Sequence, residues 1–205
     1  DVCSSDLKKA GARFGGPVSM HADGYALWDS DVTPWNTVDR GPGIDVTGEM
    51  AEALRERDMK FVATFHHGFL YYYGWWTKNI DEEEYDIVDP AYRELYWPKT
   101  KVPEEEFLEY WEGVIREVVD RYRPDLLWFD GCFGNAPAAR RQSVVSHYYN
   151  SAHRWGREVV LTRKQEDLPE GVAVKDFERG RTDRLTPWVW LTDTSLNRNS
   201  WGYVQ

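Results

Sequence analysis

Residues 125–131, Asp-Leu-Leu-Trp-Phe-Asp-Gly, are the stretch that most constrains how this chain can fold. A short apolar run bounded by turn-forming residues is typical of a strand buried on both faces, as in a parallel sheet. Asp130 then stands at the carboxyl end of the strand, and Gly131 lets the chain turn away. In an (α/β) barrel the carboxyl ends of the strands hold the chemistry, so Asp130 can be catalytic. It can equally cap the next helix or fix a turn.

Strand and helix patterns alternate along the rest of the chain. Apolar runs predict strands over residues 14–21, 60–65, 125–130, 158–162 and 172–177, and helical spacing predicts helices over 45–59, 103–122 and 136–155. Such a series folds into a parallel sheet with right-handed crossovers. Polar residues recur at the predicted strand ends: His21, His66, Asp130, Arg163 and Glu178. A shared rim of this kind indicates the mouth of a barrel and favours a catalytic role for Asp130.

Composition narrows the class of partner. The formal net charge is -10, and without a compensating basic patch this argues against a nucleic-acid partner. No apolar run is long enough for a bilayer, so we expect no membrane partner. Aromatic residues make up 15% of the chain, and aromatic faces stack on sugars and line ligand clefts, which favours a carbohydrate. Cys3 and Cys132 indicate neither a disulfide framework nor a zinc site.

Two segments stand apart from the alternating pattern. Residues 1–7 resemble the translation of a sequencing adapter, so we expect a non-native leader there and a partial catalytic barrel over residues 8–205. On this interpretation the first strands of the barrel are missing. Residues 69–102 form a long aromatic and acidic insertion, and ordered loops of that length are usually functional.

Histidines follow two of the predicted strands. His21 opens a polar and aromatic loop that includes Trp28; it can donate a hydrogen bond to a substrate hydroxyl or be held by the loop backbone. His66 and His67 are adjacent on extended backbone, so their side chains point to opposite sides. One of them can face the pocket while the other packs behind it. The two are therefore poor joint ligands for one metal, and we expect no metal site.

Several motifs together resemble the α-L-fucosidases of glycoside hydrolase family 29. Met20-His21-Ala22-Asp23-Gly24-Tyr25 with Leu27-Trp28-Asp29-Ser30 is similar to that family's Lys-His-His-Asp-Gly-Phe motif and its trailing Leu-Trp-Asp-Ser. Trp128-Phe129-Asp130-Gly131 resembles the nucleophile strand, and Asp89-Pro90-Ala91-Tyr92 and Ser200-Trp201-Gly202-Tyr203 recur in similar places. The resemblance implies a (β/α)8-like catalytic barrel, here without the β-sandwich domain that often follows it.

The resemblance also implies a retaining hydrolysis of terminal α-L-fucose. Asp130 would be the nucleophile, and the mechanism requires a second carboxyl about 5–5.5 Å away as acid and then base. Glu178 is the candidate for that role, and Asp176, two residues earlier, is the alternative. The sugar would be bound by His21, Trp28, His66, His67, Trp128 and Arg163. No cofactor or metal is implied, and the partner is a fucosylated oligosaccharide or glycoconjugate.

Two other functions stay open at this stage. A metal-dependent hydrolase on the same barrel could use His21, His66, His67 and Asp130. An inactive carbohydrate-binding fragment would keep the aromatic residues but lack the missing strands, some of which carry sugar-binding residues in the family. The sequence leaves the compartment undetermined, although the family resemblance is compatible with a secreted or periplasmic parent protein.

Overall fold

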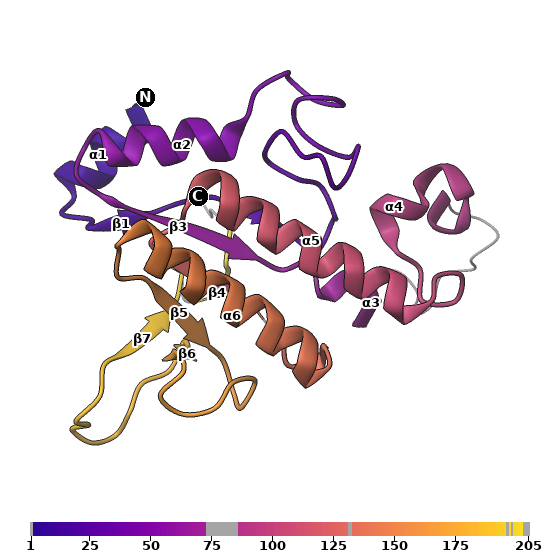
Figure 1. Ribbon diagram of the computed structural model, residues 1–205. Coiled ribbons are helices and arrows are strands. Elements are labelled where there is room, and N and C mark those ends of the chain that lie inside the picture. Colours follow the sequence, from indigo (N-terminus) through magenta and orange to yellow (C-terminus); the bar gives the residue numbers. More distant parts are fainter. Residues whose placement is uncertain (1, 73–85, 131–132, 196, 198, 203–205) are drawn as a thin grey trace.

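A sheet of parallel strands forms the centre of the molecule (Figure 1). The computed structural model describes residues 2–72, 86–130, 133–195, 197 and 199–202. The sheet order is β1-β3-β4-β5-β6-β7, with β2 also paired to β3, and each of these pairs is parallel. The strands are β1 (Phe14–Gly15), β2 (Val18–Met20), β3 (Lys60–Phe65), β4 (Leu126–Phe129), β5 (Val160–Arg163), β6 (Val174–Glu178) and β7 (Trp190–Asp193). Neighbouring strands follow the chain order, as they do in part of a (β/α)8 barrel.

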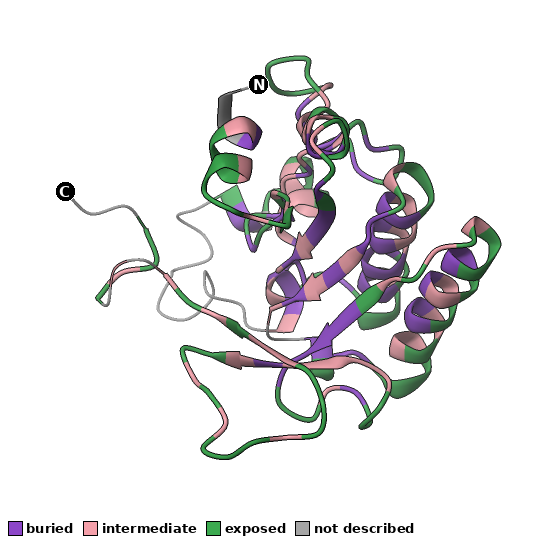
Figure 2. Ribbon diagram, turned by 90° about the vertical axis from the view of Figure 1, so that its left-hand side faces the viewer, coloured by how far each residue is buried: buried purple, intermediate pink, exposed green. Residues whose placement is uncertain are grey.

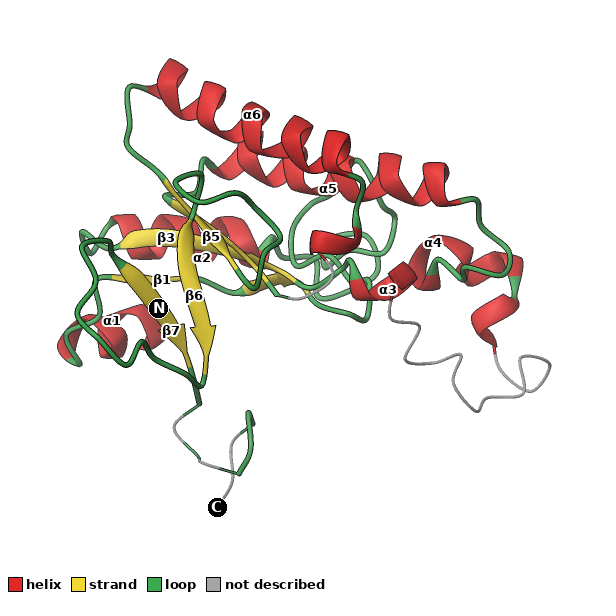
Figure 3. Cartoon of the chain, turned by 90° about the horizontal axis from the view of Figure 1, so that it is seen from below, coloured by secondary structure: helices red, strands yellow, loops and turns green. Residues whose placement is uncertain are grey.

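Helices cover one face of this sheet. The long helices are α1 (Val2–Lys9), α2 (Val46–Arg55), α5 (Glu104–Tyr122) and α6 (Ala138–Trp155). Figures 1 and 3 show α5 and α6 side by side, and these two helices connect β3 to β4 and β4 to β5. The connections from β5 to β6 and from β6 to β7 contain no helix. None of the helices in the described ranges has the length and apolar character needed to span a bilayer.

The core lies between the sheet and the helices. Figure 2 shows buried residues along the strands and on the helix sides that face them. The helical spacing of residues 103–122 predicts one buried face, made of Phe107, Trp111, Val114, Ile115, Val118 and Tyr122. The first five are at most 1% exposed, whereas Tyr122 is only partly buried. In β4, Leu127 and Phe129 pack into this core, whereas Leu126 and Trp128 are only half-buried. The expectation of a strand buried on both faces is therefore wrong, because only part of a barrel closes over the second face.

Strand register decides which side chains share that second face. Thr64 pairs with Trp128, and Leu126 pairs with Val160. Thr162 then pairs with Val174, and Glu178 pairs with Asp193. Because side chains alternate along a strand, one concave face receives every second residue of each strand. At the carboxyl edge of the sheet these residues are His66, Asp130, Lys164, Asp176, Glu178 and Asp193.

Several element boundaries differ from the sequence-based expectation. The strand predicted over 14–21 is divided into β1 and β2, because Pro17 has no N–H to donate to the sheet. Asp45 caps α2 as expected, with Gly48 N donating to Oδ1 at 2.7 Å. The helix ends at Arg55, however. Its buried residues are Thr47, Ala51 and Leu54, whereas the helical spacing predicts a buried stripe of Val46, Met50, Ala53 and Leu54.

The two segments set apart in the sequence have regular structure. Residues 2–9 form α1, in which Ser5 Oγ accepts a hydrogen bond from Arg57 Nε at 3.1 Å; the non-native origin of residues 1–7 stays a prediction. The insertion contains the short helices α3 (Phe69–Tyr72), η2 (Asp86–Val88), η3 (Pro90–Tyr92) and α4 (Arg93–Tyr96), and η4 (Phe133–Asn135) follows β4. Its acidic run, residues 81–84, lies outside the described residues.

Candidate active site

Lys164 lies at the centre of a cluster of charged side chains at the carboxyl edge of the sheet. Its Nζ atom donates to Asp130 Oδ1 at 2.8 Å, to Asp193 Oδ2 at 3.3 Å and to Glu178 Oε2 at 3.4 Å. The Lys164 side chain is only 10% exposed. Burial alone would lower the pKa of Lys164, but the hydrogen bond to Asp130 and the three negative charges outweigh it and raise that pKa. The amine is therefore a fixed cation at neutral pH.

The cluster depends on how β5 and β6 end. Lys164 and Glu178 are each followed by a residue in the left-handed backbone conformation, Gln165 with φ 48° and Arg179 with φ 47°. Non-glycine residues adopt this conformation infrequently, and such residues are concentrated at functional sites. These turns leave Lys164 and Glu178 at the rim, beside Asp130.

Asp130 and Glu178 are held at a short separation by this shared cation. Oxygens of both carboxylates contact the same Nζ atom, so they cannot lie further apart than the sum of the two contact distances, 2.8 and 3.4 Å. The limit applies to the two contacting oxygens, and it is compatible with the separation of about 5–5.5 Å between the carboxyl groups of retaining glycosidases. The Glu178 side chain is 54% exposed and the Asp130 side chain 26%, so both are open to a ligand.

Trp128 forms an aromatic wall next to these carboxylates. Its indole Nε1 donates to Asp176 Oδ2 at 2.7 Å. The Lys164 Nζ atom lies 4.5 Å from the centroid of the Trp128 ring, within the range of a cation–π interaction. The indole ring therefore has a fixed orientation between strands β4, β5 and β6.

His21 and His66 complete the described rim. Their rings stack with centroids 4.5 Å apart, and His66 Nδ1 lies 3.2 Å from Asp130 Oδ2. Burial, followed by the neighbouring His66, lowers the pKa of His21, although Asp23 and Asp130 act in the opposite direction. His21 is therefore uncharged at neutral pH and can hydrogen-bond a hydroxyl group.

His67 is not brought to this site. It is 1% exposed, its Nε2 atom lies 3.2 Å from the carbonyl oxygen of Trp111 in α5, and its ring stacks on that tryptophan. Burial lowers the pKa of His67 to about 4, so the ring is neutral. The alternation of adjacent side chains holds as expected, but His67 belongs to the core between β3 and α5 and does not face a substrate.

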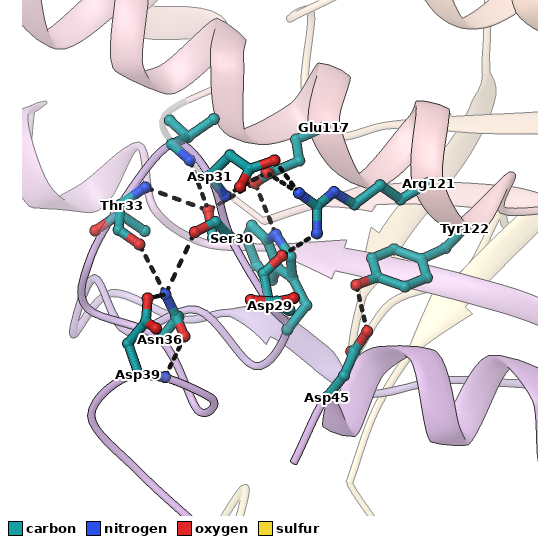
Figure 4. Close-up of polar contacts among 12 residues, drawn as sticks. Asp29, Ser30, Asp31, Thr33, Asn36, Asp39, Asp45, Glu117, Arg121 and Tyr122 are labelled. Carbon is teal, nitrogen blue, oxygen red and sulfur yellow. Dashed lines mark hydrogen bonds and ion pairs between the residues drawn. The ribbon is translucent and has the colours of Figure 1, made fainter. Parts of the chain in front are cut away.

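Trp28 is also placed away from the rim, against Glu117 of α5. It is fully buried, and its Nε1 donates to Glu117 Oε2 at 2.8 Å. The same carboxylate accepts from Ser30 Oγ at 2.6 Å and from Asp31 N at 2.6 Å (Figure 4). The Trp28 side chain therefore fastens the loop after β2 to α5 and is not free to contact a sugar.

Arg163, which the sequence suggested for sugar binding, points away from the site, and its neighbour Lys164 points into it. Arg163 is the last residue of β5, on the face opposite to Asp130, and its Nη1 donates to the carbonyl oxygen of Gln165 at 3.3 Å. Lys164, one residue later, reaches the cluster instead. Sequence reasoning did not single out Lys164 or Asp193. The only signals for Lys164 were its position after a strand and its charge among predicted carboxylates.

The alternative function considered from the sequence was a metal-dependent hydrolase, in which the histidines would bind a metal ion. In the described part of the chain, no group of three or more His, Cys, Asp or Glu side chains is arranged to hold a metal ion. His67, one of the four proposed ligands, lies in the core. The positive charge beside Asp130 comes from Lys164.

Comparisons with known proteins agree with this architecture. The family model described as alpha-L-fucosidase matches residues 4–205. Tissue alpha-L-fucosidase of Bos taurus is 26% identical over 205 residues, and plasma alpha-L-fucosidase of Homo sapiens is 27% identical over 205 residues; each match covers 96% of this chain and 39% of the relative. The chain thus spans about two fifths of the length of these curated relatives.

A solved structure shares the fold. Thermotoga maritima alpha-fucosidase, in complex with a mechanism-based inhibitor, matches with a TM-score of 0.61 at 22% identity, over 93% of this chain and 39% of that chain. At this level of identity the likeness concerns the fold alone. Together with the observed parallel sheet, it confirms the partial (β/α)8 barrel that the sequence predicted.

Proposed function

This chain belongs to the alpha-L-fucosidase family, and we propose that it carries the catalytic carboxylates of a retaining α-L-fucosidase that removes terminal fucose from oligosaccharides or glycoconjugates. The observation that supports this most strongly is the contact of both Asp130 and Glu178 with the Nζ atom of Lys164. Two carboxylates that contact one cation are close enough for one of them to attack directly while the other acts as acid and base.

The reaction proceeds in two displacements. In the first, a carboxylate oxygen of Asp130 attacks the anomeric carbon of fucose, and the bond from this carbon to the glycosidic oxygen breaks as that oxygen takes a proton from Glu178. In the second, Glu178 removes a proton from water, and the resulting hydroxide attacks the anomeric carbon and displaces Asp130. Fucose is released, and both carboxyl groups return to their initial protonation states.

Exposure supports Glu178 over Asp176 as the acid and base. An acid must reach the glycosidic oxygen of a bound substrate, and the Glu178 side chain is 54% exposed. Asp176 is 3% exposed, and one of its oxygens already accepts the indole N–H of Trp128. Asp176 is therefore too deeply buried for the contact with the leaving group that this role requires.

The sugar is bound by the side chains that surround Asp130. His21 and His66 contact its hydroxyl groups, and the face of Trp128 packs against its C–H groups. Lys164, and not the predicted sugar-binding residue Arg163, places a positive charge beside Asp130. The ammonium group lies against the carboxylate that attacks, and the two-carboxylate chemistry requires no metal or cofactor.

Turnover of 4-nitrophenyl α-L-fucoside tests the function on the longest gene product that carries these residues. Asp130→Ala should abolish nitrophenol release, whereas Asp183→Ala, an exposed carboxylate in the connection from β6 to β7, should not change it. Turnover that survives Asp130→Ala would exclude the assignment. Activity that is lost on adding a chelator would instead favour a metal-dependent hydrolase.

The acid and base assignment has its own test. Glu178→Ala should retain the first displacement on the nitrophenyl substrate, because that leaving group needs little protonation. Azide, which needs no base, should then rescue turnover and yield a fucosyl azide. If azide leaves the rate unchanged, Glu178 does not hold this role.

Titration calorimetry with fucose on the 205-residue chain separates binding from turnover. Heat of binding without hydrolysis would identify a carbohydrate-binding fragment.

A further inference from the structure

We propose that Asp176 and Asp193 share one proton, and that the resulting acid–carboxylate pair positions the Trp128 indole and the Lys164 ammonium group beside Asp130. The existence of the pair is independent of the reaction. Its effect on turnover rests on the function proposed above.

The first argument is the hydrogen bonding of the two carboxyl groups. Asp176 in β6 and Asp193 in β7 lie on adjacent parallel strands. Because Asp176 pairs with Leu191 and Glu178 pairs with Asp193, the two aspartates are diagonal neighbours on the same face of the sheet. The Oδ1 atoms of both residues are buried, and no donor in the described part of the chain reaches either atom. Ionised carboxylates only accept hydrogen bonds, so contact between these groups requires a proton on one of them.

The second argument is the use of the remaining oxygens. Asp176 Oδ2 accepts from Trp128 Nε1 at 2.7 Å, and Asp193 Oδ2 accepts from Lys164 Nζ at 3.3 Å. Each Oδ2 atom therefore has a donor, whereas the Oδ1 atoms of both residues are buried without one in the described part of the chain. One shared proton satisfies the two Oδ1 atoms, whereas two ionised groups would leave two buried acceptors in mutual repulsion.

The charges around Asp176 and Asp193 favour the state in which the two groups share one proton over the state in which both are ionised. Lys164 is the cation that faces the pair, and its Nζ atom also donates hydrogen bonds to Asp130 and Glu178. A second ionised aspartate would add a fourth carboxylate to one ammonium group, with His66 further along the rim. Burial raises the pKa of Asp176, and the negative charge of Asp193 adds to this against the opposing hydrogen bond from Trp128.

Asp176 acts on the reaction through Trp128. The centroid of the indole ring lies 4.5 Å from Lys164 Nζ and 5.5 Å from the centroid of the His66 ring. The orientation of the indole therefore determines the shape of the site beside the nucleophile. Loss of the shared proton at high pH would force the two aspartates apart and release the indole N–H. The pair is thus a positioning device whose effect on activity disappears as the pH rises through its raised apparent pKa.

The proton is tested by NMR on the 205-residue chain, with ¹³C in the aspartate carboxyl groups and ¹⁵N in the tryptophan indoles. One carboxyl of the pair should stay protonated well above the usual aspartate range, and the Trp128 N–H resonance, assigned with Trp128→Phe, should shift at the same pH. Asp176→Asn should remove this titration and keep the indole hydrogen-bonded, because the amide accepts from Trp128 and donates to Asp193.

Asp125 is an internal control in the same spectra. It is buried too, but hydrogen bonds from Phe61 N and Arg157 overcome the effect of burial and lower its pKa. If Asp176 and Asp193 both titrate in the usual range, as ionised neighbours, the proposal is wrong. This result does not depend on whether the chain hydrolyses fucosides.

Kinetics test the positioning role. Asp176→Leu should lower kcat/KM by about tenfold to a hundredfold, the loss expected for a misplaced active-site group, while Asp176→Asn should recover most of it and extend the alkaline limb of the pH profile. Azide should rescue neither variant. A large loss in Asp176→Asn with azide rescue would make Asp176 the acid and base and overturn the proposal. Absence of any fucoside turnover in the unaltered protein would count against the proposed function and leave the NMR test intact.

Discussion

The Nζ atom of Lys164 lies 2.8 Å from Oδ1 of Asp130, so that a buried ammonium group meets the carboxylate that follows the central strand. The two residues come from the ends of neighbouring parallel strands and lie on the same face because of their register. Lys164 thereby links Asp130, the proposed nucleophile, to the two carboxylates supplied by β6 and β7. The arrangement makes Lys164 the residue on which the geometry of the whole cluster depends.

Replacing Lys164 by Met should therefore impair both activity and stability. Its three carboxylate partners would lose their common cation, and the free energy of unfolding at pH 7 should fall by about 1–3 kcal/mol, the usual effect of leaving a buried charge without its partner. Urea unfolding measures this change, and fucoside turnover should drop with it. Lys164→Arg is the matched control, because it keeps the charge. Unchanged kcat/KM in Lys164→Met would contradict the role given to this amine.

His67 should make the protein sensitive to mild acid. Its pKa is about 4 in the folded chain, against 6.5 for an ordinary histidine, so the unfolded chain binds the proton more readily. Stability should fall as the pH drops from about 6.5 to about 4, by on the order of 3 kcal/mol at most. His67→Phe should flatten this part of the pH dependence, as measured by urea unfolding at several pH values. The exposed His153→Gln should not, and equal slopes for both variants would rule out the assignment.

Glu117 should be important for the loop that carries Trp28 and Ser30 (Figure 4). Its side chain is 8% exposed and accepts hydrogen bonds from both of these residues. Glu117→Ala would leave several buried donors without an acceptor, so we expect a loss of roughly 2–4 kcal/mol in the free energy of unfolding and a change in tryptophan fluorescence. Glu109→Ala, at an exposed position of the same helix, should change stability by less than about 0.5 kcal/mol. Similar effects of the two substitutions would argue against this anchoring role.

Much of the fold could be predicted from the sequence because its signals are local. The run from Leu126 to Phe129 and the helical stripe of α5 each indicate one element, and the alternating order then indicates a parallel sheet. The last strand, β7, was not predicted because it lies at the edge of the sheet and is half-exposed, which leaves it without a clear apolar period.

The site was harder to predict, because it depends on register and on distant partners. Strand β5 continues to Arg163, one residue beyond the predicted end, so Lys164 faces the cluster. A shift of one residue reverses which side chain points inward. Trp28 looked like a sugar-binding residue because its hydrogen-bond partner, Glu117, lies 89 positions away in the sequence. Such a pairing has no local signature.

Covalent trapping of Asp130 tests the central proposal most directly. A 2-deoxy-2-fluoro-fucosyl fluoride should react with the nucleophile and stall. The fluorine at position 2 slows both displacements, but the fluoride leaving group at position 1 speeds the first, so the covalent intermediate accumulates. Mass spectrometry of the digested protein should then find one fucosyl adduct, on the peptide that contains Asp130, and none in Asp130→Ala. An adduct on another carboxylate, or one that persists in Asp130→Ala, would contradict the account.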